Sequence, residues 1–132
     1  MTASRSTPVE VDPFDLPEVL GTGAVTWSAT DSLAGHLVRG VLVPDDGDPV
    51  DCDLMAVDEA YPAPVADDAT RLAAHQSWRH GQVALVAYDG RVTVLVPGRT
   101  FGPETVLEAI RRFAKALGAR PADYAVRLRV GG

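Results

Sequence analysis

"QVALVAYDGRVTVLVP", residues 82–97, decides the fold class of this 132-residue chain. Two runs rich in Val and Leu flank the dipeptide Asp89-Gly90. This dipeptide suits a type I′ turn, because both of its residues tolerate a positive φ. We therefore expect a tight antiparallel hairpin, with the rest of the domain built around it.

A predicted helix lies on each side of this hairpin. The upstream helix begins after a cap at Asp67 or Asp68 and ends at Gly81. The downstream helix, in residues 102–121, has Pro103 in its first turn and a stop at Gly118. Its apolar side chains fall within an arc of about 120°, as expected of a helix that packs on a sheet. They are Val106, Leu107, Ile110, Phe113, Ala114 and Leu117.

The remaining segments complete an α+β fold. A short helical turn is expected within residues 13–20, and strands are expected at 24–29, 37–43, 50–57 and 124–130. The element order is thus short helix, three strands, helix, two strands, helix, strand. It predicts a single domain over residues 13–132, with an antiparallel sheet of about six strands and two main helices packed on one face. Residues 1–12 are polar and aperiodic, and are interpreted as a mobile tail.

The order of elements over residues 13–118 resembles the small α+β fold of type III secretion chaperones and of YbjN-like proteins. The resemblance rests on element order alone, and the last predicted strand departs from it.

Composition points to a globular protein of the cytoplasm. The chain is 46% hydrophobic and 23% charged, and it has one cysteine. It contains no apolar run of the length that a membrane span or secretory signal requires. The net charge of −6 argues against nucleic acid as the main partner, since phosphate binding needs a concentrated basic face.

The charge is unevenly distributed along the chain. Residues 99–132 hold seven Lys and Arg against three acids, whereas residues 1–98 hold five against fifteen. Such a chain could dock on a second copy as a homodimer, or on another protein, because complementary fields steer association. Alternatively, the two halves interleave in the fold and their charges cancel.

The stretch "AAHQSWRHGQ", residues 73–82, is the strongest candidate for a site. On a helix, the small side that includes Ala69, Ala73, Gln76 and His80 is expected to meet the sheet. The opposite side then carries an aromatic ringed by basic residues, which is typical of an interaction face. Its members are Arg71, His75, Trp78 and Arg79. The alternative is that the N-terminal segment, with Phe14 and Leu16, covers the indole.

The sequence gives less support to a catalytic site or a metal site. His75 and His80 are five residues apart, so one helical face cannot present both to a metal ion, and we expect no metal or other cofactor. Cys52 is predicted to be a core residue, since burial and nearby carboxylates disfavour the reactive thiolate. The candidate carboxylates for acid/base catalysis are Asp58 and Glu59, with His75 and His80 on the next helix expected within reach.

We therefore expect a non-catalytic protein-interaction module, an adaptor or a chaperone-like protein. It would use the helical face defined above or a sheet edge. The competing hypothesis is a small-ligand domain or enzyme with a pocket between sheet and helix, lined by Trp27, Asp58, Glu59 and Tyr61, with His75 beside them. A third hypothesis is weak RNA binding through four arginines, namely Arg111, Arg112, Arg127 and Arg129.

Overall fold

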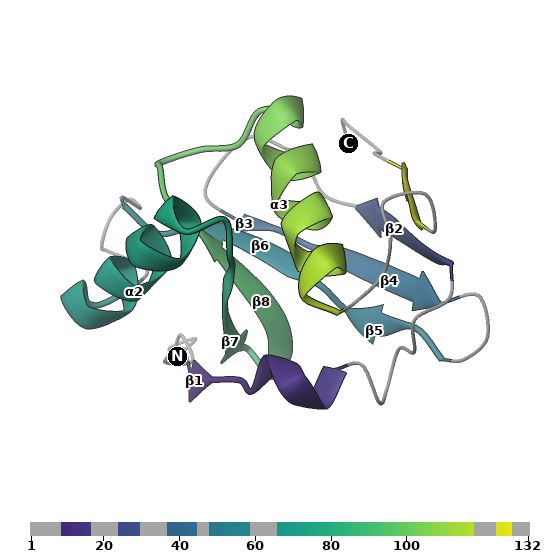
Figure 1. The fold of residues 1–132 in the computed structure, drawn as a ribbon, viewed down its shortest axis with the longest axis horizontal. Coiled ribbons are helices and arrows are strands. Elements are labelled where there is room, and N and C mark those ends of the chain that lie inside the picture. The colour runs from purple at the N-terminus through teal and green to yellow at the C-terminus, as the bar shows by residue number, and fades with distance from the viewer. Residues whose placement is uncertain are drawn as a thin grey trace, which may run out of the picture.

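The structure, a computed structural model, describes residues 9–16, 24–29, 37–44, 48–58, 66–117 and the backbone of 124–127. Two helices and a one-turn 3-10 helix accompany nine strands in this part of the chain (Figure 1). The helical elements are η1 (Pro13–Asp15), α2 (Asp68–Arg79) and α3 (Pro103–Ala116). The strands are β1 (Val9–Glu10), β2 (Val25–Ala29), β3 (Leu37–Val38), β4 (Gly40–Pro44), β5 (Val50–Asp51), β6 (Asp53–Ala56), β7 (Ala84–Tyr88), β8 (Arg91–Val96) and β9 (Tyr124–Arg127).

The strands form two sheets that share one long hairpin, in which β3 and β4 (residues 37–44) pair with β6 and β5 (residues 50–56); we call it the shared hairpin. The first sheet has the order β1-β7-β8-β6-β3, and the second has the order β5-β4-β2-β9. Leu37 pairs with Met55 across β3 and β6, and Leu42 pairs with Val50 across β4 and β5, so both pairings keep the same register. The interruption between them is bridged by a hydrogen bond of 3.0 Å from the Cys52 N–H to the Gly40 carbonyl. The ladder therefore continues from one sheet into the other.

The predicted all-antiparallel sheet is wrong, because two of the pairings are parallel. β6 pairs with β8 in parallel, and β2 pairs with β9 in parallel. The β7–β8 hairpin docks on β6 through its second strand. Since the two strands of a hairpin run in opposite directions, the choice of docking strand decides whether the pairing is parallel. The α+β class and the predicted strand positions within the described ranges are confirmed.

Local signals for the hairpin and for α2 are confirmed, whereas the predicted stop at Gly118 lies outside the described residues. Asp89 and Gly90 have φ values of 55° and 76°, as the predicted turn requires. The Asp67 carboxylate accepts a hydrogen bond of 2.7 Å from the Thr70 N–H at the start of α2. Hydrogen bonding to Thr70 lowers the pKa of Asp67 below its ordinary value, because the bond favours the charged form. At the other end, Gly81 has a φ of 78° just beyond the helix.

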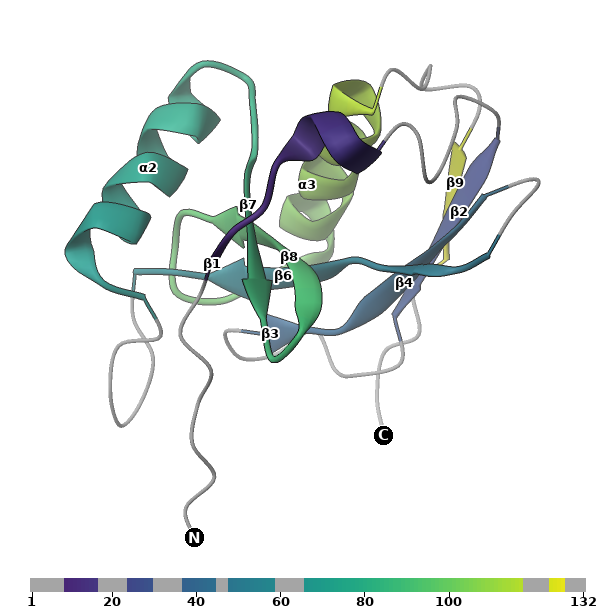
Figure 2. The ribbon, with the colours of Figure 1, turned by 90° about the horizontal axis from the view of Figure 1, so that it is seen from below.

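The two helices contact different faces of the first sheet, so their predicted placement on one face is wrong. Alternate side chains of β6 and β8, such as Leu54 and Val94, belong to a core cluster that includes Ile110 of α3. The intervening Met55 and Leu95 form a second cluster with Ala74 of α2. Figure 2 shows α3 lying over the sheet and α2 standing at its end, beside β7.

The N-terminal residues behave differently from the predicted tail. Val9 and Glu10 pair with β7 as an edge strand, and the Val11 N–H donates to the Leu85 carbonyl at 3.2 Å. After η1, the Leu16 side chain is buried in the main core cluster. Residues 1–8 of the predicted tail lie outside the described residues.

Candidate functional site

Helix α2 faces the sheet with a different side from the one predicted. Ala74 is its buried residue, whereas Leu72 has 58% of its surface exposed. The four small or polar residues that were expected to face the sheet, Ala69, Ala73, Gln76 and His80, are exposed. The inward stripe instead follows Thr70, Ala74 and Trp78 at intervals of four. Burying an indole removes more apolar area from water than burying a row of alanines, which explains this orientation.

Trp78 is half-buried and links α2 to α3. It packs against the main core cluster, and the Arg112 guanidinium lies 3.8 Å above the centroid of its ring. Arg112 also donates to the Trp78 carbonyl at 2.7 Å and to the Glu108 carboxylate at 2.8 Å. The stacked guanidinium covers the indole, so Trp78 is unsuited to be an exposed interface anchor. The N-terminal segment does not provide this cover through Phe14, which is itself 83% exposed.

The remaining members of the predicted interaction face point to different surroundings. Arg71 forms an exposed ion pair with Asp68 at 2.8 Å, and Arg79 is exposed at the end of α2. His75 turns toward the end of β6, where its Nε2 lies 2.5 Å from Oδ1 of Asp58. The four residues therefore do not present one continuous surface with Trp78 at its centre.

Asp58 and His75 meet, as the sequence suggested, at the carboxyl ends of two parallel strands. The other carboxylate oxygen of Asp58 accepts from the Gly98 N–H at 2.8 Å, and the Asp58 N–H donates to the Gly98 carbonyl at 3.0 Å. These two hydrogen bonds with Gly98 fix the position of the Asp58 carboxylate, which in turn orients the His75 imidazole ring. Gly98 has a φ of 121°, a backbone conformation that residues with a side chain rarely adopt.

The other residues of the predicted ligand pocket do not join this pair in the described structure. Trp27 is fully buried against Gly40, and its Nε1 donates to the Cys52 carbonyl at 2.9 Å. It offers no surface to a ligand. Glu59 and Tyr61 lie outside the described residues.

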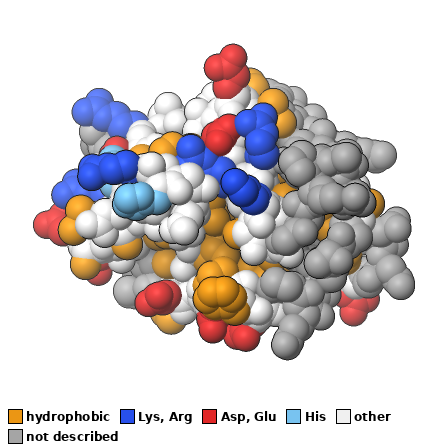
Figure 3. Space-filling view, viewed as in Figure 1, with side chains coloured by type: hydrophobic (Ala, Val, Ile, Leu, Met, Phe, Trp, Pro, Cys, Tyr) orange, Lys and Arg blue, Asp and Glu red, His pale blue; other side chains and the backbone are white. Residues whose placement is uncertain are grey.

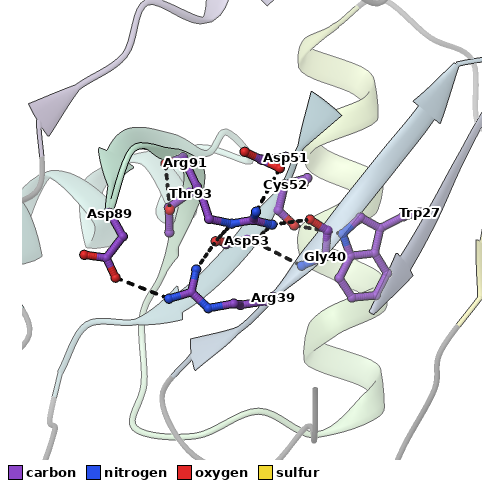
Figure 4. A network of polar contacts seen from close by, with 9 residues as sticks. All are labelled: Trp27, Arg39, Gly40, Asp51, Cys52, Asp53, Asp89, Arg91 and Thr93. Atoms are coloured by element: carbon purple, nitrogen blue, oxygen red, sulfur yellow. Dashed lines mark hydrogen bonds and ion pairs between the residues drawn. The ribbon is translucent and has the colours of Figure 1, made fainter. Parts of the chain in front are cut away.

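A buried ion-pair network, which the sequence analysis missed, lies where the shared hairpin passes between the sheets (Figure 4). Asp53 is fully buried and accepts hydrogen bonds from Arg39, Arg91 and the Gly40 N–H. Arg91 also pairs with Asp51 at 2.9 Å. Buried carboxylates need such partners, and here each carboxylate oxygen of Asp53 has at least one. The network is structural in character, because its hydrogen bonds are directed within the fold.

Cys52 lies beside this network in the core. Burial is the main cause that raises its pKa well above the ordinary value, and the negative charge of Asp53 acts in the same direction. The thiol is therefore kept protonated, in agreement with the predicted core role.

A groove open to a partner lies between η1, the α2–β7 connection and the C-terminal half of α3. We call it the η1–α3 groove. It has a volume of about 490 Å³ and is lined by Pro13, Phe14, residues 80–83, Arg112, Lys115 and Ala116. A second groove of about 410 Å³, between α2 and β7, shares Pro13 and Val83 with it. Figure 3 shows an apolar hollow at the centre of this face, with mainly Lys and Arg side chains directly above it, some Asp and Glu side chains among them, and further Asp and Glu side chains below it.

Comparisons with protein-family models, with curated proteins and with solved structures found no significant match. The resemblance in element order to secretion chaperones and YbjN-like proteins thus gains no support from them. Within the described ranges, no group of three or more His, Cys, Asp or Glu residues is placed to hold a metal ion. None of the helices in these ranges has both the length and the apolar character that crossing a bilayer would need.

Proposed function

We propose that the protein is a non-catalytic protein-interaction module that binds a segment of its partner in the η1–α3 groove. The observation that carries this proposal is the position of Phe14 at the rim of the groove with 83% of its surface exposed. Burying a phenylalanine contributes about 1.5–3 kcal/mol, and here that free energy is not used in folding. It is available to a complex, in which aromatic residues often form the anchors.

The segment that carries Phe14 is held in place before any partner arrives. The Asp12 carboxylate accepts from the Phe14 N–H at 2.9 Å, and the Asp12 carbonyl accepts from the Asp15 N–H at 3.2 Å. On the far side, the buried Leu16 anchors the turn to the core. An aromatic on such a preformed turn loses little conformational freedom on binding, which favours affinity.

The charge of the opposite wall limits what the partner can be. Arg112 and Lys115 of α3 line the groove, and Lys115 is exposed. Apolar surface from Val83 and Ala116 lies next to them. The chemistry that matches this combination is an apolar side chain flanked by carboxylates. The partner is therefore proposed to offer an acidic segment with an aromatic or aliphatic residue at its centre.

A displayed peptide library tests this proposal, with the immobilised protein kept at concentrations at which it is monomeric. We expect enrichment of peptides in which an apolar residue lies between acids. Binding should fall about tenfold or more on Phe14→Ala and on Lys115→Glu, because each removes one of the two attractions. Leu72→Ala is the matched control, since Leu72 is an exposed apolar residue outside the groove. Peptides that bind equally well to both groove variants, or no enrichment at all, would contradict the proposal.

A second candidate function is favoured by the Asp58–His75 pair. A carboxylate fixed by Gly98 and bound to an imidazole can act on a small ligand as an acid/base pair, as the competing hypothesis from sequence supposed. Thermal shift against a metabolite panel tests it. A ligand that raises the Tm of the wild type but not of His75→Ala supports this function, whereas a flat response across the panel counts against it.

A further inference from the structure

We infer that the η1–α3 groove is the interface of a symmetric dimer, in which each copy inserts Phe14 into the groove of the other. This inference rests on the proposed function, and it names the partner as a second copy of this chain. It starts from the chemistry that the groove would select, which is an apolar residue between carboxylates. The chain itself carries that pattern, as Asp12-Pro13-Phe14-Asp15, in which Pro13 and Phe14 line the groove.

The surface is self-complementary in shape. Phe14 projects from η1, and the hollow that would receive such a side chain is adjacent to it on the same face. A projection and a hollow side by side are what a two-fold interface requires, because each copy must provide both. In that arrangement the two Phe14 rings come close to one another at the axis, where aromatic pairs contribute beyond their buried area.

The surface is also self-complementary in charge. One rim of the groove is acidic, because the exposed Asp12 and Asp15 flank the lining residues Pro13 and Phe14 in the chain. The other rim carries Arg112 and Lys115 of α3. Figure 3 shows Asp and Glu side chains below the hollow, and mainly Lys and Arg side chains directly above it. A two-fold axis that runs along the groove places the acidic rim of each copy opposite the basic rim of the other. A complex of this kind has two equivalent sets of attractive contacts.

Sedimentation velocity and light scattering over a range of protein concentrations provide the first measurement. We expect the wild type to dimerise and Phe14→Ala to raise the dissociation constant by roughly a hundredfold or more, since two aromatic anchors are lost per dimer. Leu72→Ala should leave it unchanged, because Leu72 does not line the groove. Circular dichroism shows that each variant is folded.

A charge exchange between Asp15 and Lys115 provides the decisive measurement. Lys115→Glu alone places like charges opposite one another in both contacts of the dimer, and Asp15→Lys alone does the same. Each should weaken self-association by about tenfold or more. Mixed in equal amounts, the two variants should form a heterodimer, because both contacts become attractive again. Reversing the charge at Asp15 should leave η1 intact, since the hydrogen bonds of this turn involve the Asp12 carboxylate and the backbone, and not the Asp15 side chain.

The outcomes separate this inference from the proposed function. A chain that stays monomeric at millimolar concentration, a dimer indifferent to Phe14→Ala, or variants that do not restore each other on mixing would overturn the dimer. If selected peptides still bind the groove in that case, the interaction module stands with a different partner. If neither peptide binding nor self-association depends on Phe14, the proposed function and the dimer are both contradicted.

Discussion

The Arg91 guanidinium binds both carboxylate oxygens of the buried Asp53, with Nε 2.7 Å from Oδ2 and one terminal nitrogen 3.0 Å from Oδ1. The same arginine donates to the Gly40 carbonyl at 3.2 Å. Asp53 in turn accepts from the Gly40 N–H at 3.1 Å. The pair thus fixes the shared hairpin at the position where one sheet gives way to the other.

Removing one partner of this pair should be costly. We expect Asp53→Ala to lower the free energy of unfolding by about 3–5 kcal/mol, because it removes the buried acceptor of Arg39, Arg91 and the Gly40 N–H at once. Urea denaturation measures the change. Asp89→Asn is the matched control: Asp89 pairs with Arg39 at the surface, where loss of an ion pair costs about 1 kcal/mol or less. Equal losses from the two variants would contradict a special role for Asp53.

Gly40 should not tolerate a side chain. A Cβ at this position would overlap with the indole of the fully buried Trp27. Gly40→Ala is therefore expected to destabilise the protein by about 1–3 kcal/mol or more, and to shift tryptophan fluorescence as the ring is displaced. Gly102→Ser is the control, because a Cβ there meets no atom within 4 Å and serine suits the N-cap position of α3 that Gly102 occupies. A folded Gly40→Ala protein of wild-type stability would contradict this packing.

The Cys52 thiol should resist alkylation in the native state and react only on unfolding. Burial raises its folded-state pKa above the ordinary value of 9.0, so the folded protein retains the thiol proton at pH values where the unfolded chain loses it. Its contribution to stability is present below pH 9.0 and declines as the pH rises above that value. The stability difference between wild type and Cys52→Ala, measured by denaturation from pH 7 to 10.5, should therefore shrink above about pH 9. Rapid labelling of the native protein at neutral pH would refute the assignment.

The Asp67 cap should make α2 sensitive to acid. Because hydrogen bonding lowers the pKa of this carboxyl in the folded state, its contribution is present at neutral pH and is lost as the pH falls through the lowered pKa. Hydrogen exchange of the first turn of α2 measures the effect, and Asp67→Ala should increase exchange there at neutral pH. Asp67→Asn separates charge from capping, since asparagine also caps helices. That variant should keep the protection and lose its pH dependence, and an unchanged pH dependence would exclude Asp67 as its source.

Local sequence signals predicted the elements of this fold well, and the pairing between them poorly. Asp67, Gly81 and Asp89-Gly90 act on neighbouring residues, so their effects follow from a few positions. The parallel pairing of β6 with β8 depends on which strand of the β7–β8 hairpin reaches β6. Nothing within either strand encodes that choice, because the alternation of side chains is the same for both directions.

The candidate site could be predicted only in part, because it too depends on contacts between distant segments of the chain. Asp58 and His75 were expected within reach because the strand leads to the helix, and they do meet. The orientation of Trp78 was missed, since its cover is Arg112, thirty-four residues further along the chain. The sequence favours a place for Phe14 on the core or over the Trp78 indole, whereas the structure leaves 83% of its surface exposed. An aromatic next to a proline and between two aspartates was the signal that could have marked it as a surface residue.

The register that runs unbroken from β3 and β6 into β4 and β5 has a consequence for how the chain folds. A slip of one residue in the hairpin would turn side chains of both sheets to the wrong face at once, because neither sheet sets its alignment alone. Partial formation is penalised in the same way, since one sheet cannot complete its ladder while the hairpin is unpaired. The two sheets are therefore expected to melt in a single transition, as one cooperative unit.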